Sequence, residues 1–116
     1  MHDPTEGGVA TGIWELATAG GVGIRVREEA IHVFPETRSL CDALALDPMG
    51  LLASGALLMA VAKHDVDRIV DALLAEAIPA YEIGEVVGKD AGVRTVREGN
   101  ELPLLPFERD EIARVV

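Results

Sequence analysis

The sequence has little that would cross-link it or attract nucleic acid. Cys41 is the only cysteine among 116 residues, so neither an intrachain disulfide nor a cysteine-based zinc cluster can form. Aromatic residues make up 3% of the chain, so Leu, Ile, Val and Ala must build most of the core. Basic residues number 10 against 20 acidic ones, and this net charge of −10 argues against a surface for nucleic acid or anionic membranes.

Targeting and membrane signals are also missing. The longest apolar stretch, Leu51–Ala62, is too short to span a bilayer. The N-terminus is acidic and glycine-rich and lacks the basic start and apolar segment of a signal peptide. Together with the single cysteine, these features predict a cytoplasmic protein. Cys41 lies on a helical apolar face with Leu40 and Leu44, which favours a buried structural thiol over a reactive nucleophile.

What is present is the composition of a globular domain, with 49% apolar and 26% charged residues. Apolar spacing predicts a first helix from Val9 to Ala19, ended by Gly20 and Gly21, and a strand from Val22. The clearest helix begins near residue 65, capped by Asp65 or its neighbour. The remaining predicted elements are a short strand at 30–34, a helix from Pro35 to about Leu46, a strand at Leu57–Ala62 buried on both faces, a strand at 80–88 with Ile83 inward, a strand, Gly-Asn turn and return strand at 92–104, and a short helix from near Pro106. This order predicts an α+β fold, a mixed β-sheet with packed helices.

The opening stretch, MHDPTEGG, is the strongest candidate for a binding site. Asp3 or Thr5 can cap the first helix by accepting a free N–H of its first turn. Alternatively, the N–H groups of Gly7 and Gly8 can approach a phosphate at the positive end of the helix dipole. Asp3 and Glu6 would repel a bare phosphate, a conflict that Mg²⁺ would resolve. The local sequence leaves both the cap-and-turn and the phosphate-loop interpretations open.

Other polar residues suggest less chemistry. His2, His32 and His64 are far apart and lack metal-ligand spacing, and His32 is expected to point off a strand face. Asp110 and Glu111 are interpreted as ordinary surface charges. The stretch Ala53–Ala56 is interpreted as a tight turn, with close approach of a ligand or second chain as the alternative. Neither a Ser-His-Asp order nor a P-loop motif is present, so no catalytic residue is nominated.

The opening stretch, with its continuation to GVGIRV, resembles the C-terminal domain of AIR synthase-related proteins, AIR being aminoimidazole ribonucleotide. That superfamily includes AIR synthase, selenophosphate synthetase and the hydrogenase maturation dehydratase. The hydrogenase branch resembles the chain most, through Asp3–Ala10 and Gly21–Ile24. The resemblance continues through the segments EEAIHV, LCDALALDPMGLLASGALLMAV and IGEVV, and so covers roughly the whole chain.

This resemblance implies an ATP-dependent enzyme that acts as a homodimer on a small-molecule substrate. It also implies a separate N-terminal domain, absent from this chain, that supplies most contacts to ATP and Mg²⁺. The glycine-rich loop would face the cleft between the domains, which nominates Asp3, Thr5, Gly7 and Gly8 as substrate- or phosphate-binding residues. An amide or similar oxygen would attack the γ-phosphate of ATP, and phosphate would then be displaced or eliminated.

One difference from the hydrogenase branch separates two functional hypotheses. Hydrogenase maturation dehydratases carry their carbamoyl group on a C-terminal cysteine, and this chain ends in Arg114-Val115-Val116. We therefore expect an AIR synthase-related paralogue of unassigned substrate, present here as a fragment that is inactive alone. The alternative is a non-catalytic ligand-binding or dimerisation module that retains the fold.

Overall fold

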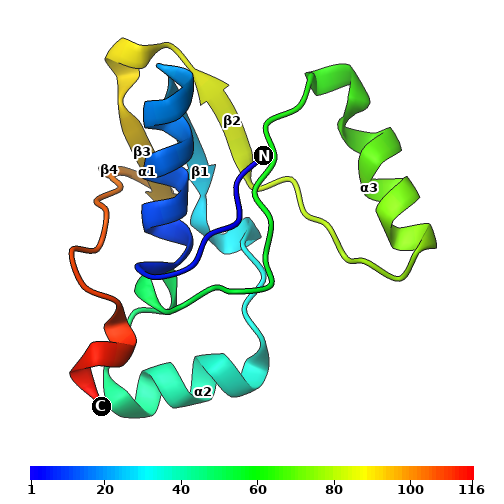
Figure 1. Ribbon diagram of the computed structural model, residues 1–116. Helices are drawn as coiled ribbons and strands as arrows, with labels where there is room; N and C mark the ends of the chain where they lie inside the picture. The colour runs from blue at the N-terminus through cyan, green and yellow to red at the C-terminus, as the bar shows by residue number, and fades with distance from the viewer.

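The computed structural model describes all 116 residues and contains three α-helices and a four-stranded sheet (Figure 1). In chain order the elements are α1 (Gly8–Gly20), β1 (Gly23–Arg27), α2 (Pro35–Leu44), α3 (Val66–Ala75), β2 (Gly84–Val87), β3 (Val93–Arg97) and β4 (Asn100–Pro103). Five short 3-10 turns lie between them, at Glu28–Ala30, Pro48–Gly50, Lys63–Asp65, Lys89–Ala91 and Glu111–Arg114.

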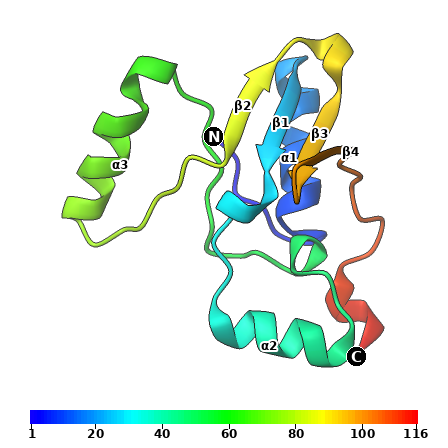
Figure 2. The ribbon, with the colours of Figure 1, turned by 180° about the vertical axis from the view of Figure 1, so that it is seen from behind.

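The sheet is mixed, which confirms the predicted α+β class. Its strand order is β2-β1-β3-β4. The central strands β1 and β3 are parallel, with Ile24 opposite Val93, and the two outer pairs are antiparallel. Helix α1 covers one face of this sheet, as the two opposite views show (Figures 1 and 2). The other face carries cross-strand ion pairs of Arg25 with Glu85 and Glu101.

The core lies between α1 and the sheet. It consists of nine buried residues: Ala10, Ile13, Ala17, Ile24, Val26, Met49, Leu58, Val93 and Leu104. The helical and alternating patterns of the sequence predict which side chains of α1 and β1 face inward. Helix α1 ends where predicted, because Gly21 adopts a left-handed φ of 63° and its N–H reaches the carbonyls of Ala17 and Thr18.

The hairpin of β3 and β4 is confirmed, with its turn one residue earlier than predicted. Glu98 and Gly99 form the turn, with φ values of 51° and 79°, and Asn100 already pairs with Arg97. Positive φ at both central residues is typical of the tight turns whose twist matches that of a hairpin. Helix α2 is also confirmed, and it ends two residues earlier than predicted, at Leu44.

The predicted strand at 30–34 is wrong. A 3-10 turn at Glu28–Ala30 ends β1, and the following residues belong to no strand. Both sides of β1 already pair with β2 and β3, so no neighbouring edge is available beside it. His32 therefore does not project from a strand; its ring stacks on Tyr81 at a centroid distance of 5.2 Å and meets Phe34 edge-on.

The predicted buried strand at Leu57–Ala62 is also wrong. Leu58 alone is buried there, and it forms an isolated antiparallel bridge with His2. The side chains of Leu57, Met59 and Val61 are 53%, 36% and 41% exposed. No strand pairs with the segment beyond this bridge, and apart from Leu58 its side chains are exposed.

Helix α3 is confirmed as an element, and it stands away from the sheet (Figures 1 and 2). Its predicted cap is not formed, because the Asp65 carboxylate pairs with Arg68 at 2.9 Å instead of accepting a backbone N–H. The predicted helix from near Pro106 is reduced to the 3-10 turn Glu111–Arg114. No helix combines the length and the apolar character needed to cross a membrane.

Candidate functional site

The opening loop is fixed by two consecutive glycines. Gly7 and Gly8 have φ values of 81° and 69°, a region that other residues adopt only at a cost. A Cβ on Gly8 would lie 2.5 Å from the carbonyl oxygen of Met49 and 2.7 Å from that of Leu51. Both glycines are buried, so the loop turns tightly against the backbone of the Pro48–Gly50 turn before α1 begins.

The N–H groups of these glycines already have partners. The Gly7 N–H donates to Asp110 Oδ2 at 2.8 Å, and the Gly8 N–H donates to the Thr5 carbonyl at 3.1 Å. The predicted cap of α1 by an Asp3 or Thr5 side chain is wrong, because Gly7 occupies the cap position without a side-chain bond. The carboxylate of Asp110, near the other end of the chain, instead accepts a backbone N–H at the start of α1.

The polar side chains of the loop are free. Asp3, Thr5 and Glu6 are exposed, and no hydrogen bond or ion pair of the structure involves their side chains. Pro4 between them is fully buried and packs against Gly12 of α1, which anchors the loop. The site residues predicted from the sequence thus divide into two glycines that shape the loop and two polar side chains that face solvent.

His2 takes no part in this polar group. Its backbone N–H and carbonyl both bond to Leu58, at 2.8 and 2.7 Å, and its Nε2 lies 3.5 Å from Glu15 Oε1. The imidazole therefore faces the side of α1 and not the N-terminal end that the loop surrounds.

A segment near the C-terminus holds the opening loop in place through hydrogen bonds that the sequence does not predict. Asp110 accepts three backbone N–H groups: Gly7 on Oδ2, and Leu52 and Ile112 on Oδ1 at 3.1 and 2.9 Å. The interpretation of Asp110 as an ordinary surface charge is wrong. A carboxylate at the start of a short helical turn is a local capping signal, yet its two distant partners have no signature in the sequence.

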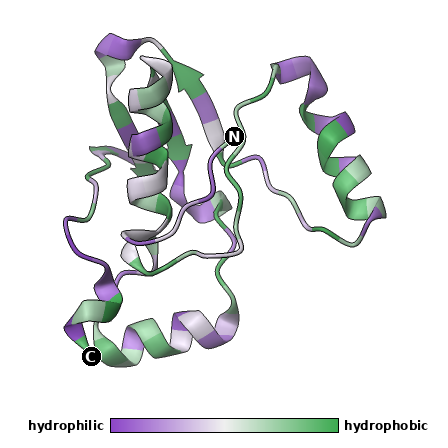
Figure 3. Ribbon diagram, in the orientation of Figure 1, coloured by the Kyte–Doolittle hydropathy of each residue, from purple (hydrophilic) through white to green (hydrophobic).

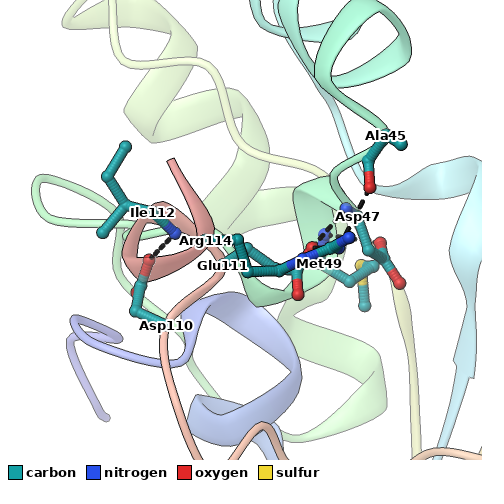
Figure 4. A network of polar contacts seen from close by, with 7 residues as sticks. All are labelled: Ala45, Asp47, Met49, Asp110, Glu111, Ile112 and Arg114. Atoms are coloured by element: carbon teal, nitrogen blue, oxygen red, sulfur yellow. Dashed lines mark hydrogen bonds and ion pairs between the residues drawn. The ribbon is translucent and has the colours of Figure 1, made fainter. Parts of the chain in front are cut away.

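Glu111 is likewise structural and not a surface charge. It is buried, and its Oε2 accepts the Asp47 N–H and an N–H of Arg114, both at 2.9 Å (Figure 4). Arg114 also donates to the carbonyl of Ala45 at 3.0 Å. This network connects the last turn of the chain to the end of α2.

The part of the same segment that precedes Asp110 in the sequence is attached to α1. The Phe107 N–H donates to Thr11 Oγ1 at 2.9 Å, the Trp14 indole N–H donates to the Leu104 carbonyl, and the Phe107 ring covers Gly50. We call residues 104–114 the C-terminal strap. The conformation of the opening loop therefore depends on residues about a hundred positions away.

A hollow in the surface lies apart from the loop, whose residues do not line it. It has a volume of about 610 Å³ and lies between α2, the Glu28–Ala30 turn, the end of β3 and the strap. Six acidic side chains line it against three arginines, Arg38, Arg97 and Arg114. Arg97 is bound by Glu28 at 2.9 and 3.1 Å, which raises its pKa, and Arg114 is bound by Glu111. This charge balance does not suit a phosphate.

A metal ion has no complete set of ligands in this domain. No group of three or more His, Cys, Asp or Glu side chains lies close enough together to hold one. Asp3 and Glu6 offer two carboxylates, and a Mg²⁺ ion would take its other oxygen ligands from water and a bound phosphate. The side chains of this domain alone therefore do not complete the coordination of a metal ion.

Cys41 is buried, as predicted, with 1% of its surface exposed. Burial raises the pKa of its thiol, which lowers the fraction of the reactive thiolate. We expect a thiol reagent at pH 8 to label the native domain at least about 100-fold more slowly than the urea-unfolded chain. Labelling of the native domain at the unfolded rate would contradict this burial.

Comparison with known proteins identifies the family of the chain. Residues 1–97 match the sequence model of the family described as AIR synthase related protein, C-terminal domain. The carbamoyl dehydratase HypE of Rhizobium leguminosarum bv. viciae is 39% identical over 92 residues, which cover 78% of this chain and 26% of that protein. The chain thus spans about a quarter of the length of the curated relatives it matches.

Solved structures show the same fold. The crystal structure of Escherichia coli HypE superimposes with a TM-score of 0.85 at 32% identity, over 98% of this chain and 36% of that one. A structure of the hydrogenase maturation protein HypE in complex with ATP superimposes with a TM-score of 0.81 at 28% identity, over 93% of this chain and 35% of that one. The chain belongs to the AIR synthase related family, and its similarity is to the C-terminal domain of that family.

Proposed function

We propose that this chain is the substrate- and phosphate-facing domain of an ATP-dependent enzyme, and that the isolated domain is inactive. The reaction class is phosphorylation of an amide or similar oxygen by ATP, with phosphate lost in a following step. A relative is named carbamoyl dehydratase, and a structural neighbour was solved with ATP, which supports this class.

The observation that carries the proposal is the pair of free polar side chains on a rigid loop. Asp3 and Thr5 make no contact that stabilises the fold, and Gly7, Gly8 and the buried Pro4 hold them at the N-terminal end of α1. The partial positive charge of a helix N-terminus attracts a phosphate or a developing oxyanion. Thr5 can donate a hydrogen bond to such a group, and Asp3 can accept one from an amide N–H.

The remaining contacts must come from elsewhere. Asp3 and Glu6 place two carboxylates beside the proposed phosphate position, and like charges repel. An N-terminal domain that supplies ATP contacts and Mg²⁺ would offset this repulsion, so the proposed partner is that domain. A homodimer and a cytoplasmic location complete the proposal, together with a small-molecule substrate and no role for nucleic acid or a membrane.

A second candidate is a non-catalytic binding or dimerisation module. It is favoured by the hydrogen bonds of Gly7 and Gly8, because their N–H groups already donate to the Asp110 carboxylate and the Thr5 carbonyl. In this case the loop closes upon the domain itself, and the exposed side chains of Asp3 and Thr5 have no catalytic consequence.

Substitutions in the loop separate the two candidates. In the full-length enzyme that contains this domain, we expect Asp3→Ala and Thr5→Ala each to lower ATP turnover by about 10- to 1000-fold. The midpoint of urea unfolding should not change, because neither side chain stabilises the fold. The control Thr18→Ala changes an exposed side chain at the other end of α1 and should leave turnover intact.

Three results would count against the enzymatic proposal or a part of it. Unchanged turnover in both loop variants favours the module. Robust ATP hydrolysis by the 116-residue chain alone would show that the domain does not need a second one. A large loss of stability in Asp3→Ala would mean that the loop side chains are structural.

A further inference from the structure

The apolar sequence of Leu57–Ala62 predicts a buried segment, but most of its side chains are exposed. A continuous apolar run of this length is typical of a strand buried on both faces. In the structure the run is extended and largely exposed, and Leu58 is its only buried residue. Figure 3 shows that the hydrophobic ribbon, in green, continues from this run toward α3. Helix α3 has no buried residue either, and its main contacts are with the turn that precedes it.

The single bridge of this segment defines where a partner strand would run. His2 and Leu58 exchange both backbone hydrogen bonds, at 2.8 and 2.7 Å, in antiparallel orientation. In an antiparallel ladder such doubly bonded pairs recur at every second residue. The next pairs would therefore join Ala60 and Ala62 to the residue directly before Met1 and to the residue two positions farther upstream.

The backbone direction at the N-terminus fits this ladder. The N-terminus lies beside the Leu57–Ala62 segment in both ribbon views (Figures 1 and 2). The chain covers only about a quarter of its curated relatives, and the family model that it matches describes a C-terminal domain. The polypeptide that relatives carry ahead of this domain is thus the occupant that the geometry favours.

We propose that Leu57–Ala62 is an incomplete strand, and that a β-strand contributed by the polypeptide N-terminal to Met1 pairs with it in antiparallel register with the His2–Leu58 bridge. Pairing satisfies the outward N–H groups of Ala60 and Ala62, which have no hydrogen-bond acceptor in this chain. An unpaired apolar edge of this kind is otherwise a site of association between chains. The proposal rests on the N-terminal domain of the proposed function, but its readout is backbone pairing at Ala60 and Ala62 and not ATP turnover, so the two can fail separately.

The test compares the 116-residue chain with a chimera that carries the upstream segment of E. coli HypE joined to Met1. Backbone amide hydrogen exchange is followed by NMR. In the chimera we expect the exchange of the Ala60 and Ala62 N–H groups to slow by about 100-fold or more. The N–H groups of Met59 and Val61 point to the other side of the strand and should slow less, and the amides of β1 serve as the reference for folding.

Proline variants provide a matched pair within the chimera. Ala60→Pro removes an N–H that faces the proposed strand, whereas Val61→Pro removes one that faces away. We expect Ala60→Pro to abolish most of the protection of Ala62, about tenfold or more, and Val61→Pro to retain it.

Two outcomes would overturn the proposal. One is an unprotected Ala60 and Ala62 in a chimera whose β1 amides exchange normally. The other is protection of the 116-residue chain alone that increases with its concentration, which would identify a second copy as the occupant. If the chimera does not fold, the same upstream segment is added as a separate polypeptide, and failure to protect Ala60 and Ala62 at saturating excess then refutes the proposed pairing.

Discussion

Replacing Asp110 by alanine is expected to lower the free energy of unfolding by about 2–4 kcal/mol. Its carboxylate accepts hydrogen bonds from Gly7, Leu52 and Ile112, and so connects the start of α1, the segment after the Pro48–Gly50 turn, and the strap. Alanine would leave these three N–H groups without their acceptor, and charge-assisted bonds of this kind exceed ordinary ones in strength. Urea denaturation followed by circular dichroism measures the change.

Two further variants make this prediction specific. Asp110→Asn keeps an oxygen for Leu52 and Ile112 and sets an NH₂ group against the Gly7 N–H, so its effect should be intermediate. Glu108→Ala changes an exposed neighbour in the same strap that makes no hydrogen bond, and it should stay within about 0.5 kcal/mol of the wild type. A loss in Asp110→Ala no larger than in this control would mean that the carboxylate does not secure the loop.

Substituting Gly8 by alanine is expected to cost about 3 kcal/mol or more, because two unfavourable effects combine. The left-handed φ of 69° costs a non-glycine residue about 1–2 kcal/mol. In addition, the new Cβ would lie 2.5 Å from the Met49 carbonyl oxygen, and this neighbour is backbone that cannot move aside easily.

Gly21→Ala is the matched control for this substitution. Gly21 has a similar φ of 63°, and nothing lies within 4 Å of the position of its Cβ. It should therefore lose only the conformational part, about 1–2 kcal/mol. The difference between the two unfolding energies isolates the close approach at the loop, and equal losses would contradict it.

Helix α1 and strand β1 show which structural features local sequence patterns predict. The apolar spacing from Val9, the glycine pair at 20–21 and the alternation of Ile24 and Val26 predict their type, their ends and their buried faces. All of these signals are local, because period and capping act within a few residues. The same holds for the hairpin around Gly99 and for the burial of Cys41.

The errors fall where distant residues decide the outcome. The strand predicted at 30–34 follows β1, which has no free edge to join, and the apolar run at Leu57–Ala62 has no strand on either side beyond His2. A strand requires a partner, and local patterns do not identify one. The cap of α1 failed as a prediction for the same reason, since its carboxylate comes from Asp110.

The candidate site shows the same division. The sequence by itself determined that Asp3, Thr5, Gly7 and Gly8 form a loop at the start of a helix, because two consecutive glycines interrupt regular structure directly before the helical apolar spacing from Val9. Only the tertiary structure decided that Gly7 binds Asp110 of the strap, that Gly8 packs against the backbone of the Pro48–Gly50 turn, and that the Asp3 and Thr5 side chains remain free. The physical reason is that hydrogen bonds and close contacts between residues a hundred positions apart depend on how the whole chain packs, and no local pattern encodes them.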